Sequence, residues 1–322
     1  MRRLRAAVVL ISFAIFSIGI HGCHSKPSVV IKESSSFLTQ DRSKLKDTNG
    51  TLVEQRGFRI ESKFGKEIDC HRIVYLSDGL RVVGFIVKPA QIESRLPVIL
   101  FNRGGGLEYG NITKENLIYL SFLASQGYVL IASQYRGNSG GEGREEFGGK
   151  DVDDVLNLIP LAESLPFTDP SRIGMLGFSR GGMMTYLAIK EGAPIKAAAV
   201  VGGLSDLLQF FEGKGKDKMK SVIRELVGPD IEEYKKRSAY DWPERINVPV
   251  LILHGEEDRV VDVSQARKFG ERMKALGKPH ELVIIPNGDH GLNNLRSQRD
   301  RIILEWFAKY LKTEPIPTSP LN

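Results

Sequence analysis

The sequence predicts an α/β fold in which a doubly wound, mostly parallel sheet carries a small helical lid insertion. Short, continuous apolar runs, typical of buried parallel strands, alternate with helical stretches through most of the chain. Alternation of this kind is the pattern of a single sheet with helices on both faces. The composition, 41% apolar and 26% charged with two Cys in 322 residues, is that of a globular protein. It excludes a collagen, a disulfide scaffold and a multi-span membrane protein.

The amino terminus is expected to be an export signal. Three arginines in the first five residues precede a mainly apolar run from Ala6 to Ile20. As a helix this run would span roughly 23 Å, less than the ~30 Å of a bilayer core. The sequence Ile20-His21-Gly22-Cys23 is similar to a bacterial lipobox, from which His21 departs. We therefore interpret residues 1–22 as a signal peptide of lipoprotein type and Cys23 as the lipidation site.

This interpretation places the protein outside the cytoplasm and lowers its charge. A lipidated Cys23 predicts a lipoprotein of the bacterial cell envelope, and the alternatives are a periplasmic or secreted protein and an uncleaved anchor. The net charge of +6 includes three Arg and no acidic residue from residues 1–22, so the remainder carries +3 and suggests no nucleic-acid partner. Cys70 is then the one remaining thiol, and we expect a small core or surface residue there.

The domain boundaries follow from periodicity. Residues 23–57 are polar without sustained periodicity, which predicts a tether, and residues 58–312 are expected to form the domain, followed by a tail at 313–322. A strand is expected near 58–62, and Asp78-Gly79 predicts a hairpin between strands at 71–76 and 80–87. Later strands are expected at 97–101, 128–133, 173–177, 197–201, 248–253 and 281–285. Helices are expected at 116–125, 152–162, 181–190, 264–276 and 297–310. Residues 203–245, with nine basic and nine acidic residues, interrupt the alternation and predict the lid.

Two Gly-x-Ser-x-Gly sequences compete for the role of a nucleophile. Gly177-Phe178-Ser179-Arg180-Gly181 follows an apolar strand and precedes a helical stretch, which is the context that a strained nucleophile turn requires. The second match, around Ser139, is followed by a polar and Gly-rich segment and is expected to be a turn. Ser179 is therefore the candidate nucleophile.

A serine hydroxyl needs a base, and the base needs an acid that orients it. Among the three His after Ser179, His290 lies in a Gly-flanked loop behind the last predicted strand, where this type of sheet places its ligand-binding edge. His280 precedes that strand and is expected to be solvated, whereas His254 is expected to be a hydrogen-bonded structural residue. Asp258, in the loop after the preceding strand, is the candidate acid, and Glu256, Glu257 and Asp262 are the alternatives.

Stabilisation of an oxyanion requires donors that are in place before reaction. One is expected to be the backbone N–H of Arg180, at the start of the helix after Ser179. The second is expected from the loop Asn102-Arg103-Gly104-Gly105-Gly106, where glycines let the main chain approach a substrate closely.

These motifs resemble the catalytic domain of the prolyl oligopeptidase-like serine peptidases of the α/β-hydrolase superfamily. The likeness covers roughly residues 70 to 312 and includes Gly-Phe-Ser-Arg-Gly-Gly, Gln134-Tyr135-Arg136-Gly137, Gly148-Gly149-Lys150-Asp151-Val152, His254-Gly255 and Gly288-Asp289-His290-Gly291. It implies the α/β-hydrolase fold, with Ser179 as nucleophile, Asp258 as acid and His290 as base.

Two departures from that family bear on function. Many members carry a Tyr or His where Arg103 stands, and in some the Tyr hydroxyl is an oxyanion donor, so here the donor would be a backbone amide near Arg103 or Gly104, or Arg103 itself. Larger members also carry an amino-terminal β-propeller that restricts the substrate, and the predicted tether is too short to form one.

The sequence thus predicts a serine hydrolase that forms an acyl-enzyme. By resemblance, the leading hypothesis is a prolyl oligopeptidase-like peptidase for short peptides or aminoacyl amides. The alternatives are a carboxylesterase for small esters and a ligand-binding lipoprotein without catalysis. No metal or organic cofactor is implied, because the sequence has no H-E-x-x-H, P-loop or pair of cysteine ligands. The expected partners are the small substrate and, through a lipid on Cys23, a membrane.

Overall fold

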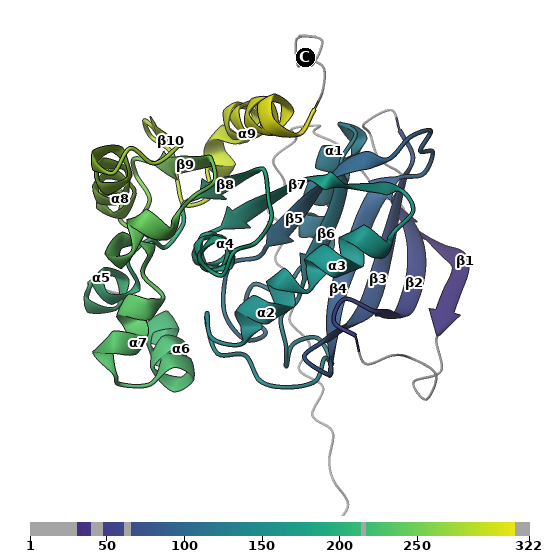
Figure 1. Ribbon diagram of the computed structural model, residues 1–322, viewed down its shortest axis with the longest axis horizontal. Coiled ribbons are helices and arrows are strands. Elements are labelled where there is room, and N and C mark those ends of the chain that lie inside the picture. Colours follow the sequence, from purple (N-terminus) through teal and green to yellow (C-terminus); the bar gives the residue numbers. More distant parts are fainter. Residues whose placement is uncertain (1–30, 40–47, 61–65, 214–216, 313–322) are drawn as a thin grey trace, which may run out of the picture.

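A computed structural model describes residues 31–39, 48–60, 66–213 and 217–312 of the chain. They form one ten-stranded sheet in the order β1-β2-β3-β4-β6-β5-β7-β8-β9-β10 (Figure 1). The strands are β1 (Ile31–Thr39), β2 (Leu52–Ile60), β3 (Ile68–Ser77), β4 (Leu80–Pro89), β5 (Leu96–Asn102), β6 (Val129–Ser133), β7 (Thr168–Phe178), β8 (Ala197–Val201), β9 (Val250–Gly255) and β10 (His280–Ile285).

The sheet has an antiparallel part and a parallel part. Strands β1 to β4 pair antiparallel with their neighbours, and β4 pairs antiparallel with β6. From β6 through β5, β7, β8 and β9 to β10 every pairing is parallel. The expected doubly wound α/β sheet is therefore confirmed. The carboxyl ends of the parallel strands share one edge, where the loops after β5, β7, β9 and β10 meet.

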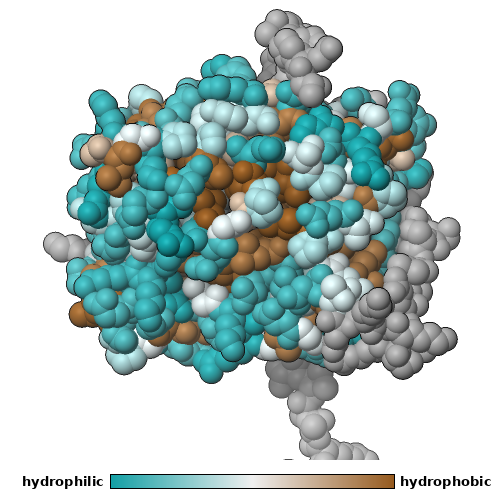
Figure 2. Space-filling model, in the orientation of Figure 1, coloured by the Kyte–Doolittle hydropathy of each residue, from teal (hydrophilic) through white to brown (hydrophobic). Residues whose placement is uncertain are grey.

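Helices cover both faces of the sheet, as expected. They are α1 (Lys114–Ser125), α2 (Asp151–Leu156), α3 (Leu158–Ser164), α4 (Arg180–Lys190), α5 (Leu207–Glu212), α6 (Asp217–Val227), α7 (Ile231–Lys236), α8 (Ser264–Ala275) and α9 (Arg296–Leu311). One apolar core lies between the sheet and α2, α3, α4 and α8, and a second lies between the sheet and α1 and α9. Figure 2 shows the molecule from the side of α2, α3 and α4, where polar residues surround an apolar hollow at the centre.

The tether prediction is wrong for part of residues 23–57. Strand β1 pairs with β2, and β2 pairs with β3 from Leu52↔Tyr75 to Ile60↔Ile68. Cross-strand polar contacts, such as Gln55 Nε2 with His71 Nδ1 at 2.9 Å, stabilise β2. Strand β1 lies at the sheet edge, and residues 52–57 of β2 are mostly polar, so the hydrophobic pattern predicted only the end of β2, as the strand near 58–62.

A second difference concerns the helix expected at 152–162. It is divided at Asn157 into α2 and α3. Pro160 lies in the first turn of α3, where a backbone N–H has no partner within the helix, so its absence costs nothing. In a continuous helix, residue 160 would have to donate its N–H to the carbonyl of Leu156, which proline cannot do. Proline thus explains the division.

The insertion at 203–245 is helical, as expected, and contains α5, α6 and α7. A Cβ atom placed on Gly106 would lie 3.2 Å from Cγ1 of Val222 in α6, so this helix packs against the glycine loop after β5. The insertion therefore covers that loop from outside.

The signal peptide, Cys23 and the tail at 313–322 lie outside the described residues. Within the described ranges, every helix is too short or too polar to cross a bilayer. Cys70 is buried beside Ser121, as expected for a core residue, and burial raises the pKa of its thiol to about 12.

Candidate active site

Ser179 occupies a sharp turn between β7 and α4. Its φ is +55° and its ψ is −123°, a conformation that L-residues rarely adopt, and its N–H donates to the carbonyl of Val201 at 2.9 Å. A Cβ atom on Gly181 would overlap the carbonyl of Asn102, and one on Gly177 would overlap Gly181. The two glycines of the motif are therefore required by close packing, and the turn places Ser179 above the sheet edge.

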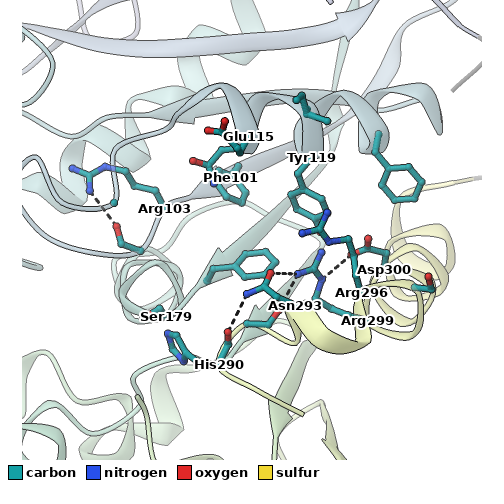
Figure 3. Close-up of a pocket in the computed structure, with 18 residues that line it drawn as sticks. Phe101, Arg103, Glu115, Tyr119, Ser179, His290, Asn293, Arg296, Arg299 and Asp300 are labelled. Atoms are coloured by element: carbon teal, nitrogen blue, oxygen red, sulfur yellow. Dashed lines mark hydrogen bonds and ion pairs between the residues drawn. The ribbon is translucent and has the colours of Figure 1, made fainter. Parts of the chain in front are cut away.

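Asp258 and His290 form a hydrogen-bonded pair next to this turn. Oδ2 of Asp258 lies 2.8 Å from Nδ1 of His290. Because a carboxylate accepts, the Nδ1 atom carries the proton, and Nε2 of His290 is left as the basic nitrogen. Ser179 and His290 line the same cavity and lie side by side (Figure 3). The sequence-predicted residues Ser179, Asp258 and His290 are thus brought together.

Asp258 is held as a carboxylate by four donors. Its Oδ1 atom accepts from the N–H groups of Val260 and Val261 at 2.7 and 2.9 Å. Its Oδ2 atom is also 3.0 Å from Nε2 of His254. Burial favours the neutral acid, but the hydrogen bonds from His254, His290 and Val261 outweigh it and hold the pKa of Asp258 well below its usual range. A charged acid is what an orienting group for His290 requires.

His254 and Ser139 have the structural positions that the sequence predicts, whereas His280, which was expected to be solvated, is half-buried. His254 is buried, and its Nε2 atom faces two acceptors, Asp258 and the carbonyl of Val261 at 2.9 Å, so it donates to both. His280 begins β10 at the opposite edge and contacts the carbonyl of Lys278. Ser139 lies in a turn, where its N–H donates to Glu108.

The geometry separates the oxyanion candidates. A Cβ atom on Gly104 would lie 3.2 Å from Cβ and 3.8 Å from Oγ of Ser179, so this stretch of main chain approaches the serine closely. The N–H of Arg180 is at the first position of α4, where a helix leaves it without an intrahelical partner. The Arg103 guanidinium instead donates to the carbonyls of Gln134, Gly104 and Leu107, and Figure 3 shows it turned away from Ser179. The two backbone amides are therefore better placed than the Arg103 side chain.

A buried cluster of charges supports the glycine loop, and sequence reasoning missed it. It consists of Arg103, Glu145, Asp151 and Arg180, all at most 2% exposed. Arg180 pairs with Glu145 and Asp151 and donates to the carbonyl of Gly105 at 3.0 Å. Glu145 accepts from the N–H of Leu107 at 3.0 Å. Through Arg180, at the start of α4, and through Glu145, the cluster thus holds the glycine loop after β5 in place next to Ser179.

A cavity of about 790 Å³ opens beside the candidate nucleophile and base. Rings line one wall, with the ring centre of Phe178 5.9 Å from those of Phe101 and Tyr119. The remaining lining is mixed, and the set comprises Phe101, Arg103, Gly104, Gly110, Glu115, Asn116, Ile118, Tyr119, Phe122, Phe178, Ser179, His290, Gly291, Asn293, Arg296, Ser297, Arg299 and Asp300. Its size is that of a small-molecule or short-peptide site.

The chain is similar to a known protein family and to several individual proteins. The model of the prolyl oligopeptidase family matches residues 116–314. YtmA of Bacillus subtilis, described as an uncharacterized peptidase, is 36% identical over 233 residues, covering 71% of this chain and 88% of YtmA. YuxL of the same organism, with the same description, is 32% identical over 305 residues, covering 89% of this chain and 45% of YuxL. YitV of that organism, described as a candidate esterase, is 28% identical over 70% of this chain and 94% of its own length.

Solved structures show the same fold. Pyrococcus horikoshii acylaminoacyl peptidase superposes with a TM-score of 0.65 at 23% identity, covering 82% of this chain and 49% of that one. A puromycin hydrolase superposes with a TM-score of 0.67 at 19% identity, covering 82% and 47%. The chain thus spans about half the length of these structures. With the family model and YtmA, these findings lead to one assignment: the chain belongs to the prolyl oligopeptidase family of serine hydrolases, with the α/β-hydrolase fold.

Proposed function

We propose that this protein hydrolyses short peptides or aminoacyl amides through an acyl-enzyme on Ser179. The observation that carries the proposal is the Asp258–His290 hydrogen bond of 2.8 Å beside a serine in a strained turn. His290 takes the proton of Ser179 while the Oγ atom attacks the carbonyl carbon. The amides of Arg180 and Gly104 receive the developing oxyanion.

The second half of the reaction uses the same groups. His290, oriented by Asp258, gives its proton to the leaving amine as the carbon–nitrogen bond breaks. A water molecule, deprotonated by His290, then attacks the acyl-enzyme and releases the acid. Peptide substrates are supported by the family and by a structural relative, an acylaminoacyl peptidase solved with Z-Gly-Gly-Phe-chloromethyl ketone.

A carboxylesterase is the second candidate. It is favoured by the likeness to YitV over 94% of that protein's length. A panel of aminoacyl nitroanilides and short-chain nitrophenyl esters separates the two, with the Ser179→Ala variant as control. We expect turnover of the anilides that disappears in Ser179→Ala. If only the esters are hydrolysed, the peptidase proposal is wrong and the carboxylesterase proposal takes its place.

We further propose that the protein is exported and tethered by a lipid on Cys23. The support is the sequence: the arginines and apolar run of residues 1–22, followed by Ile20-His21-Gly22-Cys23. Membrane fractionation of bacterial cells tests this. The full-length chain should sediment with membranes, and Cys23→Ser should lose the lipid mass and leave that fraction. Equal membrane binding by both chains would contradict the anchor.

A further inference from the structure

The cavity beside Ser179 has two chemically different walls (Figure 3). Phe101 of β5, Tyr119 and Phe122 of α1, and Phe178 of β7 form an apolar wall. The adjoining wall begins at His290 and continues through Gly291 and Asn293 to Arg296 at the start of α9. On this helix, Arg299 lies over the rings of Tyr119 and Phe178 at 4.8 and 5.3 Å, where the two walls meet. An apolar group and a polar group of one substrate can therefore be bound at the same time.

Four charged side chains line this cavity apart from Arg103, and three of them already have partners. Nε of Arg299 donates to Asp300 at 2.7 Å, and Nη1 of Arg299 donates to the carbonyl of Gly291 at 2.9 Å. Arg299 and Asp300 are buried, so they stabilise the wall. The exposed carboxylate of Glu115 accepts from the hydroxyl of Thr113 at 2.7 Å.

Arg296 is different. Its side chain lines the cavity, is exposed, and makes no hydrogen bond or ion pair with any residue in the described part of the chain. An unpaired guanidinium on the wall of a cavity is a ready partner for a carboxylate, which it can bind through two parallel hydrogen bonds. Arg296 thus provides the cavity with a cationic group that can pair with a carboxylate of a substrate.

The location of Arg296 indicates which part of a substrate it meets. His290 protonates the leaving group, so that group must lie against His290. Arg296 lies on the wall that continues from His290, six residues further along the chain. In a short peptide, the leaving part is the amine portion, and it ends in the free carboxylate.

We propose that the cavity binds the leaving portion of a short peptide with a free carboxyl terminus, pairing the carboxylate with Arg296 and the apolar side chain with Tyr119 and Phe178. This inference rests on the proposed function and specifies its substrate class. The reaction balances as ordinary hydrolysis: the peptide carbon–nitrogen bond breaks, the serine proton passes through His290 to the amine, and one water molecule completes the released acid. The released amino acid or dipeptide keeps its carboxylate throughout.

The test uses two substrates that differ only at the carboxyl terminus, Z-Ala-Phe and Z-Ala-Phe amide, with release of the Phe portion measured by chromatography. The wild-type protein should hydrolyse the free acid with a kcat/KM about ten-fold higher than that of the amide, the effect of one charge-assisted pair. Arg296→Gln should remove that preference by lowering kcat/KM for the acid alone, and Arg296→Lys should retain part of it.

The matched control is Arg301→Gln, on the same helix, because Arg301 is exposed, pairs with Glu305 at 3.0 Å and lies outside the cavity lining. It should leave both substrates unchanged. Equal rates on acid and amide in the wild type, or an equal loss on both in Arg296→Gln, would overturn the inference and leave the proposed function standing. Hydrolysis of neither peptide and of no aminoacyl nitroanilide, with nitrophenyl esters still turned over through Ser179, would overturn the peptidase proposal and this inference with it.

Discussion

The carboxylate of Asp258 and the ring of His290 meet at 2.8 Å above Gly202, the residue that follows β8. A Cβ atom on Gly202 would lie 3.2 Å from both Oδ2 of Asp258 and Nδ1 of His290. Gly202 also has a positive φ of 54°. Because Gly202 has no side chain, Asp258 and His290 can occupy the space above it.

Gly202→Ala should disturb this pair. We expect kcat/KM to fall at least ten-fold on any substrate that the wild type hydrolyses, because the new methyl group displaces His290 or Asp258. The control is Gly79→Ala, which has a positive φ of 76° but no atom within 4 Å of its Cβ position. Both variants should lose about 1 kcal/mol of stability from backbone strain. Equal activities of the two variants would contradict the assigned role of Gly202.

Asp258→Asn should leave the fold intact and reduce kcat by about 10⁴-fold, the size of effect known for removal of this charge in serine proteases. The amide cannot hold His290 in the tautomer with Nδ1 protonated as a carboxylate does. Initial rates with a nitrophenyl ester, together with circular dichroism, measure this. An activity within ten-fold of the wild type would show that Asp258 is not the orienting acid.

The pH dependence of stability provides a separate test of Asp258. Its pKa is lower in the folded chain than in the unfolded chain, so its charge stabilises the fold fully above the ordinary Asp pKa of about 3.9. That contribution is lost as the pH falls through the lower folded pKa. The difference in Tm between wild type and Asp258→Asn should therefore be constant from neutral pH to about 5 and should shrink below about 4. Calorimetric scans that show the difference growing on acidification would contradict this.

Glu145→Gln should affect both stability and the glycine loop. The substitution leaves Arg103 and Arg180 with one buried carboxylate, and breaking a buried pair costs about 3 kcal/mol. It also weakens the contact to the N–H of Leu107. We expect kcat to fall more than KM rises, because the oxyanion amides are displaced. Glu225→Gln, which removes an exposed ion pair with Arg144, is the control and should change stability by less than about 1 kcal/mol.

Cys70 should resist alkylation in the folded protein. Burial raises the pKa of its thiol to about 12, so almost no thiolate exists at pH 8. In a Cys23→Ser chain, iodoacetamide should modify Cys70 only after denaturant is added, as peptide mass spectrometry would show. Rapid modification without denaturant would mean that this part of the core opens readily.

The sequence predicted the features that depend on local patterns. The runs at 97–101 and 197–201 are apolar throughout and appear as β5 and β8, and the Gly-x-Ser-x-Gly motif locates Ser179 because only glycine fits around it. Only the end of β2 was predicted, as the strand near 58–62, because polar contacts with a neighbouring strand stabilise the rest of it. The partners Arg180 and Glu145 are 35 residues apart, and no local pattern shows that they meet. That Arg296 lines the same cavity as Tyr119 likewise depends on how α9 and α1 approach each other in the fold.

The most direct test of the central claim is to identify the residue that reacts with a fluorophosphonate. The strained turn and the Asp258–His290 pair predict that the intact wild-type chain gains the mass of one phosphonyl group, and that the group is found on Ser179. Ser179→Ala should gain none under the same conditions. A folded wild-type chain that is not labelled, or a label that persists in Ser179→Ala, would contradict the assignment of Ser179 as the nucleophile.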